Sequence, residues 1–301
     1  MSPTRNDPTW PGCHGVRLDG DAIAVGVCAG EPLADATVRF GEVASVGAAT
    51  RLWSQPGEAA NLFRRADGRL VLTGPTAPAL EVDVDAATIT IAPGELAVQR
   101  QLVASFGVPL LLHGLGVLLV HGSACARDDD AVVVCADSGS GKSSTLIRLV
   151  DDGWRSLSED LCTLDLRDGR PRVWPGPPWV RVAHGEPGPR DATPAFDSSD
   201  KTAWDVSARQ APTAVPLGRV FLLEPPGGDE TFTETLPASA ALRALARHAV
   251  WLEDPDARGQ QLFGPVAELV SRVPVVRVRL PRRDGWRDGV PALLGSEAFA
   301  T

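Results

Sequence analysis

The sequence predicts an α/β protein whose core is organised around a phosphate-binding loop, with a smaller β-rich domain before it. Three observations lead to this prediction. The stretch Ala131–Ser144 has the pattern of a buried strand, a glycine-bearing loop and the first turn of a helix. Short β-like runs separated by turn residues fill residues 1–93, and helical and strand-like patterns alternate afterwards. We therefore expect two domains, over residues 1–93 and 94–301.

The central motif has the features of a P-loop. The residues expected to surround the phosphates are Asp137, Ser138, Gly139, Ser140, Gly141, Lys142, Ser143 and Ser144. Gly139 and Gly141 let the backbone curl so that successive N–H groups point inward, and the helix N-terminus adds a partial positive charge. Lys142 is expected to reach the β- and γ-phosphates, and Ser143 to ligate Mg²⁺. Ala136 stands where the strict pattern has glycine, and the alternative is a chance glycine-rich turn.

Composition and charge narrow the class of protein. The 301 residues are 44% hydrophobic and 22% charged, which is typical of a soluble globular protein, and the formal net charge is −9. An acidic chain is poorly suited to nucleic acid or to an anionic membrane, so we expect neither as a partner. The apolar stretch Val108–Val120 is short and is interrupted by His113, Gly114 and Gly116. It predicts a core segment and not a transmembrane helix.

The cysteines show no metal-binding spacing. They are Cys13, Cys28, Cys125, Cys135 and Cys162. Because they are odd in number and form no CxxC or Cys/His pattern, we expect buried thiols instead of disulfides or a zinc site. The opening segment, MSPTRNDPTW, lacks the apolar region of a secretory signal. These features together predict a cytoplasmic protein.

The first 93 residues carry β-like runs bounded by turns. The runs are Ala22–Val27, Ala36–Phe40, Arg69–Leu72 and Ala87–Ile91. Asp19-Gly20 and Asp67-Gly68 stand where hairpin turns are expected. Two interpretations stay open for this domain, which either packs on the rest of the chain or docks the substrate.

From residue 94 onward the pattern alternates between helix and strand. Helices are expected over Gly94–Leu112, Ala238–Trp251 and Gln260–Arg272, and strands over Gly116–Ala126, Arg155–Leu161, Val220–Leu223 and Val273–Leu280. The turn Asp128-Asp129-Asp130 precedes the P-loop strand, and Asp168-Gly169 marks a further hairpin. Residues 173–200 are rich in Pro, Gly and Asp and predict a long irregular loop.

A second group of candidate residues surrounds the P-loop. Glu159 and Asp160 end the strand expected after the P-loop helix, which would bring them beside the phosphates at the carboxyl edge of the sheet. One carboxylate can bind Mg²⁺ or its water, and the other can accept a proton from an attacking hydroxyl. His121, on the strand before the P-loop strand, is a further catalytic candidate. The alternatives are a surface acidic pair and a core histidine.

Residues 115–166 together resemble the catalytic core of HPr kinase/phosphorylase. His121-Gly122, then ADSGSGKSS, then Glu159-Asp160 keep the order and spacing of three motifs of that family. The resemblance implies a P-loop kinase core of the HPr kinase/phosphoenolpyruvate carboxykinase-like type, with ATP and Mg²⁺ as cofactors. It also implies that a homo-oligomer is possible, because the family assembles as rings.

The resemblance also implies roles for individual side chains. Lys142 would hold and neutralise the phosphates, and Ser143 would ligate Mg²⁺. Asp160 would be the general base toward a serine hydroxyl, and His121 would support that carboxylate. Glu159 stands where the family has the first aspartate of its acidic pair.

The C-terminal part of the chain resembles a particular branch of these proteins. The layout of Lys201–Leu280 is similar to that of HPr-kinase-related proteins from peptide natural-product clusters, including lasso-peptide clusters. The family's later glutamate motif, which supplies a second Mg²⁺ ligand, has only Glu186, Asp191 and Asp197 as candidate counterparts. Lys201 is a candidate for contact with a phosphate, or a plain surface lysine.

The predicted function is therefore Mg-ATP-dependent transfer of the γ-phosphoryl group to a serine hydroxyl of a peptide or protein. A ribosomal natural-product precursor peptide is a candidate substrate. Two other functions stay open, a small-molecule kinase on the same core and a nucleotide-responsive regulatory or binding module without transfer activity.

Overall fold

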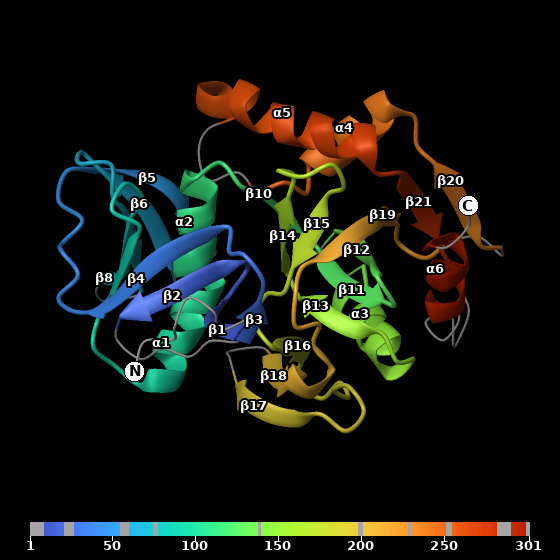
Figure 1. Cartoon of the computed structure of the whole chain (residues 1–301), viewed down its shortest axis with the longest axis horizontal. Helices are drawn as coiled ribbons and strands as arrows, with labels where there is room; N and C mark the ends of the chain where they lie inside the picture. The colour runs from blue at the N-terminus through green and yellow to red at the C-terminus, as the bar shows by residue number, and fades with distance from the viewer. Residues whose placement is uncertain are drawn as a thin grey trace. The chain divides into compact units, whose positions relative to one another are not determined.

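The chain is a mixed α/β protein with several sheets (Figure 1). The computed structural model describes residues 9–20, 27–54, 60–74, 78–137, 140–197, 201–227, 230–250, 255–281 and 290–298. Two compact units divide the chain. The first comprises Met1–Val117 with Trp251–Leu262, and the second comprises Leu118–Val250 with Phe263–Thr301.

The first unit contains a sheet of nine strands within its described residues. The strands are β1 (Thr9–Cys13), β2 (Val16–Gly20), β3 (Val27–Ala29), β4 (Ala34–Phe40), β5 (Ala49–Ser54), β6 (Asn61–Arg65), β7 (Leu70–Thr73), β8 (Pro78–Asp83) and β9 (Thr88–Ile91). Their order in the sheet is β3-β1-β2-β4-β9-β8-β7-β6-β5. The β2–β4 and β4–β9 pairs are parallel, whereas β5 to β9 form an antiparallel meander.

Several expected strands of this unit are present. The runs predicted over Ala36–Phe40, Arg69–Leu72 and Ala87–Ile91 correspond to β4, β7 and β9. Asp67-Gly68 lies in the turn between β6 and β7, where the Gly68 amide donates to the Arg65 carbonyl at 3.0 Å. Asp19-Gly20 forms the end of β2, and most of the run predicted over Ala22–Val27 lies outside the described residues.

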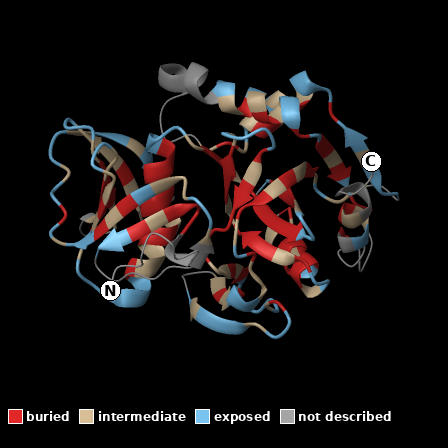
Figure 2. Cartoon of the chain, viewed as in Figure 1, coloured by how far each residue is buried: buried red, intermediate tan, exposed pale blue. Residues whose placement is uncertain are grey.

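The helix predicted over Gly94–Leu112 belongs to the first unit and not to the second. It consists of α1 (Leu96–Leu102), a π-helical turn η2 (Val103–Gly107) and α2 (Val108–Gly114). Its buried face packs on β8 and β9, and at Gly107 an added Cβ would lie 3.0 Å from the Ile89 side chain. Figure 2 shows the buried residues that line α2. The compact unit therefore extends to Val117, beyond the boundary expected at residue 93.

The second unit is built on a larger sheet. Its strands are β10 (Leu118–His121), β11 (Ser123–Arg127), β12 (Asp130–Ala136), β13 (Arg155–Ser158), β14 (Leu161–Asp165), β15 (Arg172–Trp174), β19 (Val215–Leu223), β20 (Phe232–Thr235) and β21 (Val275–Arg279). The order is β10-β14-β15-β19-β12-β11-β13, with β21 also beside β19 and β20 beside β21. The β12–β19 and β19–β21 pairs are parallel, and the remaining pairs are antiparallel.

The strand predicted over Gly116–Ala126 is split in two. β10 pairs with β14, whereas β11 pairs with β12 and β13, and the chain changes partners at Gly122. A Cβ at Gly122 would lie 3.0 Å from the Val134 carbonyl oxygen, so the close approach of the two backbones favours glycine. The turn at Asp128-Asp129-Asp130 connects β11 to its antiparallel neighbour β12. Asp168-Gly169 lies in the connection between the antiparallel strands β14 and β15.

The prediction of a long irregular loop over residues 173–200 is wrong. This region contains β16 (Trp179–Ala183) and β17 (Thr193–Asp197), which join β18 (Lys201–Asp205) in a three-stranded sheet of order β16-β18-β17 (Figure 1). Val180 and Val182 are buried while Arg181 between them is half-buried, which is the alternation of a strand. The many Pro and Gly residues around this short run conceal it in the sequence.

The remaining elements are the helices α3 (Lys142–Asp151), α4 (Ala238–Ala246), α5 (Pro255–Arg272) and α6 (Val290–Ala298) and the 3-10 turn η3 (Ser207–Arg209). All belong to the second unit except the part of α5 up to Leu262, and α3 and α6 contribute buried side chains to its core. α3 packs on β11, β12 and β13 and also contacts β16 and α6. The helix predicted over Ala238–Trp251 is shorter than expected, since α4 ends at Ala246. In the described parts of the chain, every helix is too short or too polar to cross a membrane.

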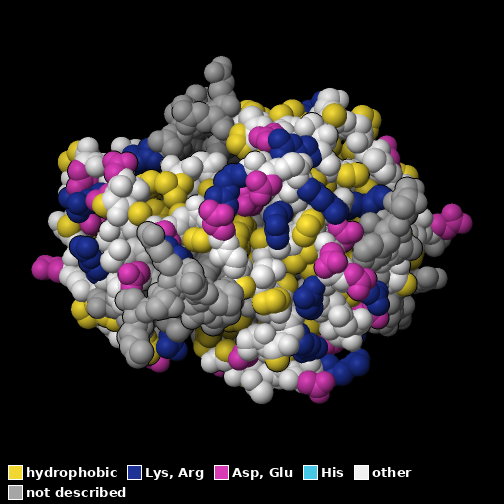
Figure 3. Space-filling view, viewed as in Figure 1, with side chains coloured by type: hydrophobic (Ala, Val, Ile, Leu, Met, Phe, Trp, Pro, Cys, Tyr) yellow, Lys and Arg dark blue, Asp and Glu magenta, His cyan; other side chains and the backbone are white. Residues whose placement is uncertain are grey.

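The structure also shows where the cysteines and the surface charges lie. Within the described residues, Cys13, Cys125, Cys135 and Cys162 are buried and form no disulfide, and the Cys28 side chain lies outside that part of the chain. On the face shown in Figure 3, basic and acidic side chains are interspersed.

Candidate functional site

The central element of the site is the connection from β12 to α3. β12 lies between its parallel neighbour β19 and its antiparallel neighbour β11, and all of its residues from Ala131 to Ala136 are buried. α3 begins at Lys142, and Gly141 before it has a φ of +96°, a left-handed conformation that glycine adopts readily. Ser138 and Gly139, two of the predicted phosphate-binding residues, lie outside the described residues.

The Lys142 side chain reaches back from α3 to the end of the preceding strand, β12. Its Nζ donates a hydrogen bond of 2.7 Å to the carbonyl oxygen of Ala136. The first turn of α3 also leaves backbone N–H groups directed toward the loop, and the helix adds a partial positive charge there. The described part of the loop therefore presents an ammonium group and a helix N-terminus at the same place.

A cavity of about 650 Å³ opens at this end of the sheet. Its wall includes Asp137, Gly141, Lys142, Ser143 and Ser144 from the loop and helix, His121 and Asp160 from neighbouring strand ends, and Arg181, Glu186 and Lys201 from the small sheet and its connection. The volume is within the range of small-molecule sites. Residues predicted separately along the sequence thus line one cavity.

The acidic pair forms a tight turn instead of continuing a strand to residue 161. β13 ends at Ser158 and β14 begins at Leu161, with Asp160 at a φ of +73°. The Leu161 amide donates to the Glu159 carbonyl at 2.9 Å, and the Gly122 amide donates to the Asp160 carbonyl at 3.2 Å. Because β12 and β13 are both antiparallel to β11, they run in the same direction. Their carboxyl ends therefore reach the same edge of the sheet.

Glu159 links the turn between β13 and β14 to the first turn of α3. Its side chain is 4% exposed, its Oε1 accepts a hydrogen bond of 3.1 Å from Ser143 Oγ, and its Oε2 lies 3.2 Å from Arg181 Nε. Burial raises the pKa of the Glu159 carboxyl above its ordinary value, and Arg181 acts against that rise. The carboxylate is thus held between a hydroxyl and a guanidinium group.

Asp160 lies more openly in the cavity, with 38% of its side chain exposed. Its Oδ1 is 3.5 Å from His121 Nδ1, and its Oδ2 accepts a hydrogen bond from Arg181 Nη2. Although burial favours the neutral form, Arg181 and His121 hold the pKa of the Asp160 carboxyl below its ordinary value. The group is therefore ionised at neutral pH.

His121 closes the other side of Asp160. It ends β10, and its backbone amide donates to the His248 carbonyl at 2.6 Å. Burial lowers the pKa of the His121 imidazole below 6.5, although Asp160 favours its protonation. At neutral pH the imidazole is therefore uncharged, and it can donate from Nδ1 toward Asp160.

The predicted pair of metal ligands fits a magnesium ion. Ser143 Oγ and Glu159 Oε1 are 3.1 Å apart. Two neighbouring ligands of octahedral Mg²⁺, each at about 2.1 Å, are about 3.0 Å from one another. No group of three or more His, Cys, Asp and Glu side chains in the described chain could hold a metal by itself. A hydroxyl and one carboxylate suit Mg²⁺ that arrives with phosphate oxygens as its other ligands.

Arg181 is the main feature that the sequence reasoning missed. It lies in the middle of β16, where its Cα pairs with that of Ala203 on β18, within the region expected to be irregular. The alternation of Val180, Arg181 and Val182 was the available signal. Lys201 lines the cavity as well. Of the three candidate second metal ligands, Glu186 lines the cavity, whereas Asp197 accepts a hydrogen bond from Thr202.

A second cavity of about 480 Å³ lies on the other side of the loop. It is formed at the ends of β12 and β19 and at the end of α4, and it includes Asp137, Arg247 and His248. Burial lowers the pKa of the His248 imidazole, while Asp137 favours its protonation. Asp137 is shared by the two cavities.

Comparisons with known proteins add little to this geometry. Neither a protein-family model nor a curated protein sequence matches the chain. The solved structures that match include that of the Hpr(Ser) kinase/phosphatase from Coxiella burnetii, with a TM-score of 0.34 and 11% sequence identity. The match covers 59% of this chain and 91% of that chain. At that TM-score the likeness carries no argument about function, which depends instead on the site itself.

Proposed function

We propose that this protein is a phosphotransferase that moves the γ-phosphoryl group of Mg-ATP to a serine hydroxyl of a peptide or protein. The proposal rests on one observation, that phosphate-binding groups and proton-accepting groups line the same cavity. Lys142 and Ser143 at the start of α3 form a phosphate-binding side, and Asp160 with His121 forms a side that can receive a proton. Glu159 connects the two sides through Ser143.

The phosphate-binding side stabilises negative charge. The backbone N–H groups at the N-terminus of α3 donate hydrogen bonds to phosphate oxygens. Lys142 exchanges its hydrogen bond to the Ala136 carbonyl for contacts with the β- and γ-phosphates. Ser143 Oγ and Glu159 Oε1 would hold Mg²⁺, which when bound neutralises charge on the phosphate oxygens. Most of the catalytic effect is expected from this positioning and charge neutralisation, as is general for phosphoryl transfer.

The other side of the cavity prepares the acceptor. Asp160 is ionised at neutral pH and can accept the proton of an attacking hydroxyl, while His121 and Arg181 fix the orientation of its carboxylate. A weak base suffices, because the hydroxyl loses its proton late in a loose transition state. The new P–O bond forms to the serine oxygen as the bond to the leaving nucleoside diphosphate breaks.

The choice of a peptide serine rests on the resemblance of residues 115–166 to HPr kinases and of Lys201–Leu280 to kinases of peptide natural-product clusters. Peptides encoded beside the gene are therefore the first acceptors to test. Small hydroxyl compounds are the comparison set, because the same cavity would also serve a small-molecule kinase.

The decisive test is incubation of the pure protein with Mg²⁺ and ATP, with and without candidate peptides, followed by intact mass measurement. We expect a gain of one phosphoryl group on a peptide serine, and loss of that gain in Asp160→Asn with nucleotide binding preserved. Full activity in Asp160→Asn would refute the base assignment. ATP binding with no transfer to any acceptor would instead identify a nucleotide-responsive regulatory module.

A further inference from the structure

One guanidinium group contacts both Asp160, which lines the cavity, and Glu159, which is buried beside it. Arg181 Nε lies 3.2 Å from Glu159 Oε2, and Arg181 Nη2 donates to Asp160 Oδ2. Two different nitrogens thus serve two different carboxylates. The side chain is 24% exposed, and its backbone is fixed by pairing of β16 with β18.

The carboxylate oxygens are divided between different partners. Glu159 Oε2 and Asp160 Oδ2 both face Arg181, whereas Glu159 Oε1 faces Ser143 and Asp160 Oδ1 faces His121. A divalent cation could not bridge these two oxygens without displacing Arg181. Only the oxygen beside Ser143 is placed to share a metal ion with the P-loop helix.

Two carboxylates this close together need a cation to remain ionised. The Glu159 side chain is almost completely buried, and an unpaired carboxylate there would lose its hydration without compensation. Arginine is suited to the task because its guanidinium group stays protonated and presents its donors in a rigid plane. Arg181 therefore supplies a permanent positive charge between the two carboxylates, where it compensates them without a metal ion.

We propose that Arg181 is the cation that joins the two acids, a positioning residue that orients Glu159 and Asp160 and replaces a second metal ion. A single divalent cation, held between Ser143 and Glu159, then suffices for transfer. The inference builds on the proposed function, since it concerns how the same cavity balances its charge.

The first measurement counts metal ions without requiring transfer. Mn²⁺ binding is followed by electron paramagnetic resonance in the presence of a non-hydrolysable ATP analogue. We expect one bound Mn²⁺ for each wild-type complex. Two Mn²⁺ ions would overturn the role of Arg181, and the absence of analogue binding would overturn the proposed function together with it.

The second measurement tests the guanidinium group by substitution. Arg181→Gln is expected to lower kcat about 10- to 100-fold, as is usual for a partner that orients a metal ligand. Added guanidinium ion at millimolar concentration should restore part of that loss, and Arg181→Lys should retain more activity than Arg181→Gln. These recoveries would not occur if Arg181 only stabilised the fold.

The matched control is Arg167→Gln. Arg167 makes two side-chain hydrogen bonds of 3.0 Å to the carboxylate of Asp165, in the turn after β14 and outside the cavity. Its loss should leave kcat unchanged and insensitive to guanidinium. An unchanged kcat in Arg181→Gln, or equal responses of the two variants to guanidinium, would refute the inference. If Arg181→Gln fails to fold, the metal count and the Arg181→Lys variant decide the question. Two Mn²⁺ ions in the wild-type complex would refute the inference. Activity of Arg181→Lys no higher than that of Asp160→Asn would also refute it.

Discussion

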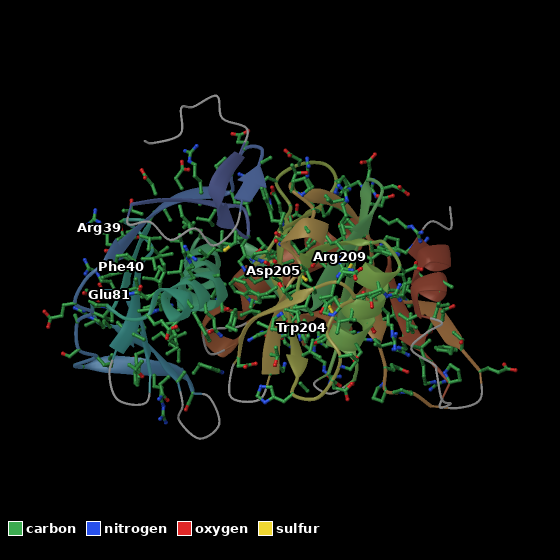
Figure 4. All side chains as sticks on the ribbon, turned by 90° about the horizontal axis from the view of Figure 1, so that it is seen from below. Arg39, Phe40, Glu81, Trp204, Asp205 and Arg209 are labelled. Carbon is green, nitrogen blue, oxygen red and sulfur yellow. The ribbon has the colours of Figure 1, made fainter. Side chains whose placement is uncertain are left out.

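Each compact unit of this protein contains a buried glutamate that meets arginine, and the two clusters differ in what their oxygens face. In the N-terminal sheet, Glu81 Oε2 lies 3.0 Å from Arg65 and Oε1 lies 3.0 Å from Arg69. Figure 4 labels Glu81 among the side chains of this sheet. In the second unit, one oxygen of Glu159 contacts Arg181, and the other accepts a hydrogen bond from the Ser143 hydroxyl.

The comparison separates a structural cluster from a candidate metal site. The side chains of Glu81 and Glu159 are 9% and 4% exposed, so burial by itself does not distinguish them. Both oxygens of Glu81 face guanidinium groups, so its charge is compensated within the sheet. One oxygen of Glu159 faces a neutral hydroxyl at a helix N-terminus, where a metal ion and phosphates can enter together.

The largest effect should come from removing the positive charge of the loop. In Lys142→Ala the phosphates lose their ammonium partner, so we expect transfer to fall about 10³-fold. Rates of phosphopeptide formation measured at saturating Mg-ATP would show this directly. Transfer at more than a tenth of the wild-type rate would indicate that Lys142 does not contact the transferred group.

A smaller effect is expected at the acid that distinguishes the two clusters. Glu159→Gln should weaken Mn²⁺ affinity of the nucleotide complex about 10- to 100-fold, because a neutral amide is a poorer ligand than a carboxylate. Thermal stability should not fall, since burial opposes ionisation of Glu159 in the wild type. A titration of Mn²⁺ together with a melting curve tests both parts. Unchanged affinity would remove Glu159 from the metal site.

The reverse outcome is expected for the structural cluster. Glu81→Gln leaves Arg65 and Arg69 without their shared carboxylate, and both arginines are partly exposed. We expect a loss of about 1–2 kcal/mol in the free energy of unfolding, measured by denaturant titration. Mn²⁺ affinity and transfer should stay at the wild-type values. A metal-binding defect in Glu81→Gln would contradict the distinction between the clusters.

The smallest effect concerns the titration of His121. Because burial lowers its pKa, the imidazole should gain a proton only at a pH below 6.5. Asp160 favours the protonated form, so Asp160→Asn should lower the His121 midpoint further. Proton NMR resolves the titration, and loss of the signal in His121→Gln assigns it. A midpoint that stays unchanged in Asp160→Asn would show that the two side chains do not interact.

Local sequence patterns were sufficient for the central elements. The apolar run before Asp137, the glycine at 141 and the apolar spacing after Lys142 are properties of neighbouring residues, and the structure places β12 and α3 there. The positions of His121, Glu159 and Asp160 followed from motif spacing, and these side chains do lie together. Their roles in catalysis stay predictions.

Other features depended on packing between distant segments. The helix of α1, η2 and α2 is visible in the sequence, but only contact with β8 and β9 assigns it to the first unit. Arg181 was not predicted because a strand of five residues between Pro- and Gly-rich segments has a weak pattern. β16 becomes a strand by pairing with β18, which lies later in the chain.

The sequence by itself determined the strand β12, the helix α3 and the order of the candidate site residues, because glycine conformation, helix initiation and strand alternation are local effects. Tertiary structure decided how charge is balanced around them. A guanidinium group on a separate small sheet reaches Glu159 and Asp160 across 22 and 21 residues of chain. Such a contact depends on how the sheets pack against one another, and no spacing rule in the sequence describes it.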